Sequence, residues 1–577
     1  MAGLAGDSGR SSAPSPSVVA VVANRRDGTT IRYAVRSPRG AEVTSREGLV
    51  RLVRELEADL TPRWTWWTAA EIAPTLVTEG VVPQRSWDIS EAHRILHGGW
   101  EAGPGVAWAA SHGIPIAGVP APPSGDLFEF ASSTPDDGRL VRPDGHLRPD
   151  AVTGDWLDAD ERLLLWAEAL AEMAERQLME ARALGPRVEA TIHSESAAAV
   201  LCVELAQHGL PLDRVIAEEL IVAAAGPRPE TVEDELAARR IRDAVVLRHV
   251  PGRESTDLRN PAQVKGLLAA VGVDVPDTRK WTLETHRHTH PVIDALLTWR
   301  KDERIATTYG HRWLALHVGA DDRLRGGWTA CDGAGGRMTA ENGLHNLPAA
   351  LRPAVAAHPG HLFVRADLGQ IEPRVLAVVS GDAAFAEATR ADDLYAPVAA
   401  RLGVERAVAK IAVLAAMYGQ RSGAAGEALK GLERAYPVAM AHLDDAYAVG
   451  VRGGDLRTFG GRLIPTGRFL RGEPIGANPA LDAARGRFAR NAVIQGAAAE
   501  LFKAWAATVR AAVAPLGAEI VLCLHDELLV HAPEGVATEV AALVDQSLTD
   551  AARRWARGAP VRFVADTSII KRWSEAK

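Results

Sequence analysis

Cysteine is scarce in this chain of 577 residues. The three cysteines, Cys202, Cys331 and Cys523, lie far apart in the sequence. This spacing excludes a disulfide framework and any CxxC zinc site. A chain with so few cysteines suits a reducing compartment, so we expect a cytoplasmic location.

Long apolar runs are missing too. No stretch of about 18 or more apolar residues occurs, so we expect no membrane span. Residues 1–16 are rich in Ala, Gly, Ser and Pro and lack the apolar core of a secretion signal, which predicts a disordered tail. The rest is globular in composition, and its length suggests roughly three to four domains or subdomains.

Excess positive charge is also absent, because the net charge is −8. This value does not mark a nucleic-acid binder. Residues 239–325, however, hold 16 Lys or Arg against 11 Asp or Glu. A solvated helical face explains such a segment equally well, so charge alone does not decide the matter.

The hydrophobic pattern predicts strands and helices in mixed order. An N-terminal hairpin is expected from VVAVVANRR and TIRYAVRS, with Asp27-Gly28 near the turn and a helix starting after Ser45 as N-cap. Further on we expect helices over 158–183, 404–419 and 487–513, a strand over 361–367, and a hairpin of strands 519–524 and 528–532.

Two carboxylates stand at the ends of these apolar strands. Asp367 closes one strand, and Asp526 sits at the tip of the last hairpin. Each has an ordinary explanation, a helix N-cap for Asp367 and a turn residue for Asp526. If the fold joins them, they match the few carboxylates that Mg²⁺ takes alongside phosphate oxygens. Two such ions about 4 Å apart can activate a primer 3′-hydroxyl and stabilise leaving pyrophosphate.

The helix over 404–419 carries an unusual stripe. Its members recur every four residues and therefore lie along one side of the helix: Arg406, Lys410, Leu414 and Tyr418. Two cations followed by an apolar and an aromatic side chain suit a nucleoside triphosphate laid along the helix. A surface helix with snorkelling side chains is the alternative.

Six motifs in order resemble those of family A DNA polymerases, the group of bacterial DNA polymerase I. The matches span roughly 195–577. DLGQIEPR (367–374) is similar to the family's DYSQIELR, RAVAKIAVLAAMYG (406–419) is similar to RxxxKxxxFxxxYG, and HDEL (525–528) is similar to VHDEL. RFARNAVIQGAAAE (487–500) is similar to RxxxNxxxQGxAAD. GRMT (336–339) with LHNLP (344–348) is similar to GRLSS…LQNIP, and WSEA (573–576) is similar to WxEA.

The resemblance implies an α+β right hand, with palm, fingers and helical thumb, preceded by an α/β RNase H-like domain of the 3′–5′ exonuclease type. A 5′ nuclease domain is not expected. The predicted parts are 1–16 (tail), 17–165 (degenerate exonuclease-like domain), 166–325 (connecting helices and thumb), 326–382 (palm, first part), 383–490 (fingers) and 491–577 (palm, second part).

The resemblance also implies roles in catalysis. Asp367 and Asp526 would bind two Mg²⁺ ions, with Mn²⁺ as a possible substitute, and Glu527 would be an auxiliary carboxylate. Arg406 and Lys410 would grip the triphosphate, with Lys410 a candidate proton donor to pyrophosphate. Further dNTP-binding residues would be Leu414, Tyr418, Glu372, Gln370 and His525, with Glu372 excluding ribonucleotides and His525 near the primer terminus.

Primer-template DNA and dNTPs are the implied partners of a monomer on the bacterial nucleoid. The basic segment 239–325 would bind duplex phosphates as the thumb. The DNA-binding residues implied by the motifs are Arg337, Arg374, Arg487, Asn491, Gln495 and Asn346. Minor-groove acceptors, common to all correct pairs, are the expected contacts of Arg337, Asn491 and Gln495.

Two motif positions depart from the family. Leu414 replaces Phe or Tyr at a position that touches the incoming sugar, which leaves sugar discrimination open. Pro373 replaces an apolar residue such as Leu, and the first turn of a helix tolerates it.

The N-terminal domain departs further. Exonuclease chemistry of this type needs four carboxylates on two metals, beginning with DxE on the first strand. That strand has no DxE, and Asn24 and Asp27 do not restore the spacing. Only the segments around Asp88 and Asp160 resemble later ligands, so a retained fold without proofreading is expected.

The predicted function is therefore DNA-directed DNA synthesis (EC 2.7.7.7) in repair, gap filling or primer replacement. A bifunctional 3′–5′ exonuclease/polymerase and a DNA-end-binding protein that has lost synthesis remain the alternatives.

Overall fold

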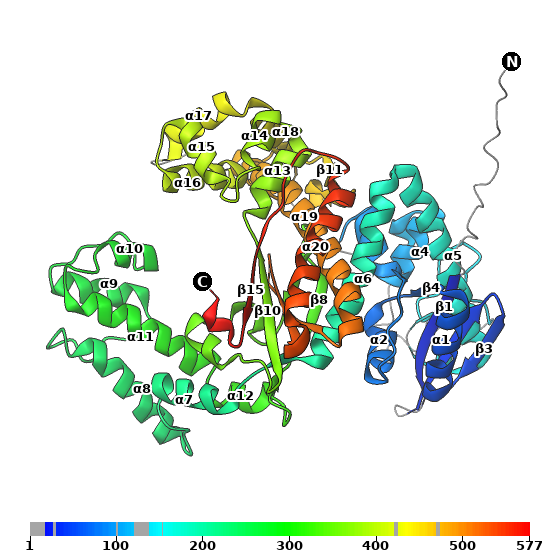
Figure 1. The fold of residues 1–577 in the computed structure, drawn as a ribbon, viewed down its shortest axis with the longest axis horizontal. Helices are drawn as coiled ribbons and strands as arrows, with labels where there is room; N and C mark the ends of the chain where they lie inside the picture. Colours follow the sequence, from blue (N-terminus) through cyan, green and yellow to red (C-terminus); the bar gives the residue numbers. More distant parts are fainter. Residues whose placement is uncertain are drawn as a thin grey trace.

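The computed structural model describes residues 18–26, 30–99, 102–120, 138–152, 154–419, 425–468, 474–524 and 526–576. The predicted tail, the turn at Asp27-Gly28 and His525 lie outside these residues. An α/β domain stands at one side of a central sheet, and two groups of helices, α7–α12 and α13–α18, project from the sheet on the other side (Figure 1).

A five-stranded sheet forms the N-terminal domain, in the order β3-β2-β1-β4-β5. β1, β2 and β3 are antiparallel, whereas β1, β4 and β5 run parallel. The predicted hairpin is confirmed, and Ser45 caps α1 by accepting from the Gly48 amide at 3.3 Å. The elements are β1 (Val18–Arg26), β2 (Thr30–Ser37), β3 (Gly40–Thr44), α1 (Arg46–Leu60), β4 (Arg63–Trp66), α2 (Ala69–Thr78), β5 (Ser86–Asp88), α3 (Ile89–His97) and α4 (Pro104–His112).

The predicted boundary after residue 165 is wrong, because it falls inside a helix. α5 runs over Asp160–Leu184 and packs on β1 and β2, so it belongs to the N-terminal domain. The next helix, α6 (Pro186–His208), packs instead on both α2 and α19 (Pro479–Val513). A buried Glu195 on α6 forms an ion pair with Lys503 of α19 at 2.5 Å and thereby ties the two halves together.

The predicted thumb is a helical arm, drawn in green tones at the lower left of Figure 1. Arg259 links its helices by donating to Glu303 at 2.6 Å and to Asp243 at 2.8 Å. Several of the arm's cations are therefore used internally. Its helices are α7 (Arg214–Ala225), α8 (Val232–Leu247), α9 (Pro261–Ala270), α10 (Lys280–Thr285), α11 (Pro291–Thr308) and α12 (His311–His317).

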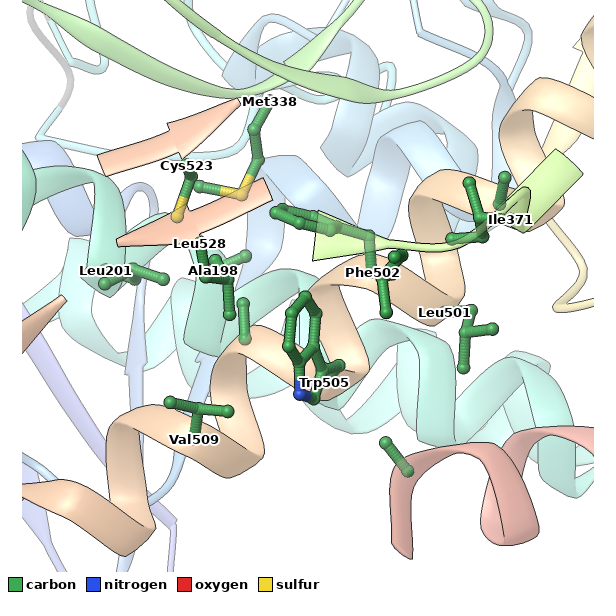
Figure 2. Packing of buried hydrophobic residues seen from close by; sticks show 14 of the residues in the cluster. Ala198, Leu201, Met338, Ile371, Leu501, Phe502, Trp505, Val509, Cys523 and Leu528 are labelled. Atoms are coloured by element: carbon green, nitrogen blue, oxygen red, sulfur yellow. The ribbon is translucent and has the colours of Figure 1, made fainter. Parts of the chain in front are cut away.

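The central sheet has the order β13-β14-β10-β15, with every neighbouring pair antiparallel. Its strands are β10 (His361–Leu368), β13 (Glu519–Leu524), β14 (Glu527–Pro533) and β15 (Ala565–Ile570), which confirms the predicted strands. α20 (Ala537–Ala556) and α19 pack against each other. Figure 2 shows Trp505 and Phe502 of α19 in the buried cluster with Leu528 and Cys523 of the sheet and Ala198 and Leu201 of α6.

α13 (Ile371–Ser380) lies in the predicted first part of the palm. The predicted fingers contain α14 (Ala383–Ala388), α15 (Tyr395–Leu402), α16 (Arg406–Tyr418), α17 (Ala425–Ala435) and α18 (Pro437–Val451). The boundary predicted after residue 490 is wrong, because α19 is continuous across it. This helix packs on both α18 and α20, so it connects the predicted fingers with the predicted second part of the palm.

Three small two-stranded sheets complete the fold: β6 (Leu210–Pro211) with β7 (Arg323–Leu324), β8 (Trp328–Asp332) with β9 (Arg337–Ala340), and β11 (Asp455–Arg457) with β12 (Leu463–Pro465). Within the described part of the chain, no helix combines the length and the apolar character that crossing a membrane requires.

Candidate active site

Asp367 and Asp526 come together at one end of the central sheet. Asp367 lies in β10 and Asp526 immediately precedes β14, and the Leu368 amide donates to the Asp526 carbonyl at 2.8 Å. Asp367 is not a helix N-cap, because that position in α13 belongs to Gln370. Burial and the neighbouring Asp526 raise the pKa of Asp367 to about 6. The structure thus joins two carboxylates that the sequence separates widely.

Arg365, which the sequence analysis missed, connects the other carboxylates of this face. It lies two residues before Asp367 on β10, so both side chains leave the same face of the strand. Its guanidinium donates to Asp367 at 2.7 Å, Glu527 at 2.8 Å and Asp566 at 3.1 Å. The Trp573 indole donates to the same Glu527 oxygen at 2.9 Å. Glu527 is therefore buried and held by two donors.

A cleft of about 360 Å³ opens beside these carboxylates. It lies between the sheet, β9 and the helices α13, α16 and α19. Nine of the residues that the motifs singled out line it: Arg337, Gln370, Glu372, Arg406, Lys410, Leu414, Tyr418, Gln495 and Asp526. The predicted helix stripe therefore faces a cavity rather than open solvent.

Glu372 ties three of the cleft's elements together. Its carboxylate accepts from Arg337 of β9 at 2.9 Å and from the Tyr418 hydroxyl of α16 at 3.1 Å. Burial and Glu372 raise the pKa of the Tyr418 phenol, while a hydrogen bond with Gln495 of α19 acts in the opposite direction. Glu372 thus holds one wall of the cleft in a defined position.

The cationic end of the cleft is formed by the first turns of α16. Arg406 forms an ion pair with Asp393 at 2.5 Å, which lowers the pKa of Asp393. Tyr395 lies beneath the Arg406 guanidinium, and burial raises the pKa of its phenol to about 12. Lys410 makes no ion pair with the described residues, so its ammonium is available to a ligand. Asp393 and Tyr395 carried no motif signal that the sequence analysis used.

The predicted DNA contact of Arg374 is wrong. Its side chain is fully buried and donates to backbone carbonyls of Gly369, Thr389 and Arg562 at 2.9, 2.6 and 2.6 Å. Such a guanidinium has no donor to offer DNA. It instead ties the loop before α13 to the segments that follow α14 and α20.

Two of the predicted DNA contacts, Arg337 and Gln495, line the cleft, whereas Arg487, Asn491 and Asn346 lie outside its lining. Arg487 packs its aliphatic stem near Gly419, and the side-chain oxygen of Asn491 is buried without a partner among the described residues. Asn346 stands at the base of the predicted thumb, where its backbone carbonyl accepts a hydrogen bond from the Tyr309 hydroxyl at 2.8 Å. His525 lies outside the described residues.

The donor set of the site determines which metal ion it could hold. Among the described residues, no group of three or more His, Cys, Asp or Glu side chains is arranged to hold a metal ion. Two adjacent carboxylates with a cationic cleft beside them nevertheless fit Mg²⁺, which keeps waters and takes its other oxygens from substrate phosphates.

The carboxylates of the N-terminal domain are arranged differently. Asp88 is buried, and its oxygens accept from the Ala69 amide at 2.7 Å and the Glu91 amide at 3.0 Å. It therefore holds the starts of both α2 and α3. Asp160, at the start of α5, forms an ion pair with Arg32 of β2. Each carboxylate thus has a partner within the protein.

Comparison with known proteins assigns this arrangement to one class. The model of DNA polymerase family A matches residues 256–575, and the chain belongs to that family. DNA polymerase I of Chloroflexus aurantiacus is 33% identical over 44% of this chain and 29% of its own length. The thermostable DNA polymerase I of Thermus filiformis is 28% identical over 52% of this chain and 38% of its own length. The chain thus spans about a third of the length of these relatives.

A solved structure is similar over nearly the whole chain. It is the POL domain of Pol1 from M. smegmatis in complex with DNA primer-template and dNTP, with a TM-score of 0.67 and 21% identity. The match covers 97% of this chain and 96% of that chain. At this identity the likeness establishes the fold.

Proposed function

We propose that this protein is a DNA-directed DNA polymerase that adds dNTPs to a primer 3′-hydroxyl on a template. The observation that carries the proposal is the cleft in which Asp526, Arg406, Lys410 and Tyr418 meet. In this cleft acidic groups would lie beside the reacting phosphate and cations beside its leaving group, as phosphoryl transfer requires.

Asp367 and Asp526 would hold the divalent ions, Mg²⁺ or in its place Mn²⁺. When bound, the ions supply activation of the 3′-hydroxyl and charge stabilisation at the α-phosphate and the pyrophosphate. The protein's own part is binding and orientation. Lys410 and Arg406 bind the triphosphate, and Lys410 donates a proton to the leaving pyrophosphate. Before it can bind the triphosphate, the Arg406 guanidinium must release the Asp393 carboxylate and donate to a phosphate oxygen in its place.

Residues in the middle of the cleft select the nucleotide. Glu372, fixed by Arg337 and Tyr418, occupies the space that a ribose 2′-hydroxyl would need. Tyr418 stacks near the templating base, and Gln370 and His525 complete the surroundings of the dNTP and the primer end. Leu414 lines the sugar side with a smaller surface than an aromatic ring offers.

The DNA would lie between the sheet and the helical arm. Arg337, Asn491 and Gln495 would read the minor groove, with Arg487 and Asn346 nearby. Residues 239–325 would bind the duplex through phosphates without sequence preference. We further propose a monomer in the cytoplasm, on the nucleoid, that fills gaps during repair or replaces primers.

We also propose that the N-terminal domain keeps an exonuclease-type fold without proofreading. The support is that Asp88 serves as a helix cap and Asp160 as an ion-pair partner, while β1 has no DxE. An active 3′–5′ exonuclease is the second candidate function, favoured only by the presence of an N-terminal α/β domain with a five-stranded mixed sheet.

Primer extension tests both proposals. The protein, Mg²⁺ and a primer-template are incubated with dNTPs, ddNTPs or rNTPs, and extension with dNTPs is expected. Tight DNA binding without extension would overturn the polymerase proposal in favour of an end-binding protein. A 3′-mismatched primer without dNTPs tests the second proposal, because release of mononucleotides would establish proofreading.

A further inference from the structure

Arg365 is a buried cation that the proposed mechanism does not use. Its side chain is 8% exposed, and three of its nitrogens each donate to a different carboxylate. Only Asp367 among these three is proposed to hold a metal ion. The contact engages Oδ2 of Asp367 and leaves Oδ1 without a hydrogen-bond donor among the described residues.

The strand register explains why a cation is needed at this position. Asp367 of β10 lies directly opposite Glu527 of β14 on one side and Asp566 of β15 on the other. Three carboxylates therefore stand side by side across three strands, where like charges repel. Arg365 is the buried guanidinium on that face of β10, and its planar fork is suited to binding several carboxylates at once.

We propose that Arg365 is a positioning residue that withholds Glu527 and Asp566 from the divalent ions and orients Asp367 toward them. The ions are then left to Asp367 and Asp526. The positive charge also limits how tightly the site binds metal in the absence of nucleotide. This inference rests on the proposed metal site of Asp367 and Asp526.

A purely structural role is the competing explanation, since a guanidinium among three carboxylates also stabilises the sheet. The two roles differ in what happens to metal binding. Loss of a structural ion pair lowers stability and leaves the number and affinity of bound ions unchanged. Loss of a positioning residue changes which carboxylates bind the divalent ions, and therefore changes their number or affinity.

Mn²⁺ binding to the free protein, counted by the loss of the free-ion EPR signal, measures this directly. Arg365→Met is expected to bind Mn²⁺ about tenfold more tightly than the wild type, because a cation is lost and Glu527 and Asp566 are released. Its kcat for primer extension is expected to fall by roughly 100-fold, because Asp367 loses its orientation. The KM for dNTP should stay within about threefold, because the triphosphate contacts are elsewhere.

Two further variants separate charge from geometry. Arg365→Lys keeps the charge but reaches fewer carboxylates, so Mn²⁺ affinity should stay near wild type while kcat still falls. Arg510→Met is the matched control, because Arg510 makes a partly buried bidentate ion pair with Glu204 at 2.6 Å, outside the cleft lining. It should lose stability without changing Mn²⁺ affinity.

Unchanged Mn²⁺ affinity in Arg365→Met would overturn the inference. If that variant does not fold, Arg365→Met with Asp566→Asn restores the charge balance, and Asp566 is an exposed carboxylate with no part in the proposed catalysis. A kcat near wild type in this double variant would make Arg365 merely structural, whereas a persistent loss of kcat with unchanged folding supports positioning. The metal site itself is tested separately, since Asp526→Ala must weaken Mn²⁺ binding whatever Arg365 does.

Discussion

The central sheet and the N-terminal sheet both carry carboxylates at strand ends, yet they use them in opposite ways. In the central sheet Asp526 faces a cleft, and Asp367 keeps one oxygen without a donor among the described residues. In the N-terminal domain both oxygens of Asp88, at the end of β5, accept backbone amides, and Asp160, at the start of α5, forms an ion pair with Arg32. The first pair is left for a ligand, and the second pair serves the fold.

Burial alone does not separate the two regions. It raises the pKa of Asp367 to about 6 and, with help from Glu91, the pKa of Asp88 to about 7. A perturbed carboxylate is therefore a weak sign of a catalytic site unless its oxygens are also free to bind. The hydrogen-bond partners, not the burial, distinguish the carboxylates that are proposed to bind metal from those of the N-terminal domain.

Replacing Asp526 should have the largest effect, and that effect should be on the rate of primer extension. Asp526→Ala is expected to lower the rate of primer extension by about 10³-fold or more, because charge stabilisation of the transition state is lost. Steady-state extension on a primed template measures it. Asp59→Ala, an exposed carboxylate of the N-terminal domain, is the control and should extend normally. Normal extension by Asp526→Ala would refute the metal assignment.

Replacing Asp88 should act on stability instead. Asp88→Ala leaves two buried amides without acceptors and is expected to reduce the free energy of unfolding by about 2–4 kcal/mol. Urea denaturation measures this. The folded variant should extend primers within about twofold of the wild type, and a large loss of extension at full folding would contradict the structural role of Asp88.

Removing Glu372 should alter selectivity more than rate. Glu372→Ala opens space at the sugar and is expected to raise the ratio of rNTP to dNTP incorporation by about tenfold or more. Competition between the two nucleotides on one template gives the ratio. Glu372→Gln keeps the volume and should stay selective, so equal relaxation in both variants would argue against a steric role.

The smallest expected effect is the pH dependence that Asp88 gives to stability. Its pKa of about 7 in the fold lies above the ordinary value of 3.8, so the folded state binds a proton that the unfolded chain has released between these values. The stabilisation is complete below pH 3.8 and is lost as the pH rises through 7. The stability difference between wild type and Asp88→Asn should therefore shrink by roughly 1 kcal/mol from pH 6 to pH 8. Denaturation at both pH values measures this difference. A stability difference that stays the same at the two pH values would disprove the linkage.

Local patterns predicted the elements well. The apolar runs ending at Asp367 and flanking Asp526 form β10, β13 and β14, and the cap at Ser45 starts α1 as expected. Domain boundaries were less accurate, because α5 and α19 each continue across a predicted boundary. Helix continuity is favoured by local hydrogen bonding, whereas a boundary depends on which partner each face contacts.

By itself the sequence determined the family motifs, the four-residue stripe of α16 and the pairing of Asp367 with Asp526 as one proposed site. Only the tertiary structure decided that Arg374 is a buried link between loops and that Arg365 binds the palm carboxylates. It also decided that Asp88 is a cap for two helices. The reason is physical: motif spacing records which residues share a helix or strand, but a charged group's role depends on which distant groups satisfy it after folding.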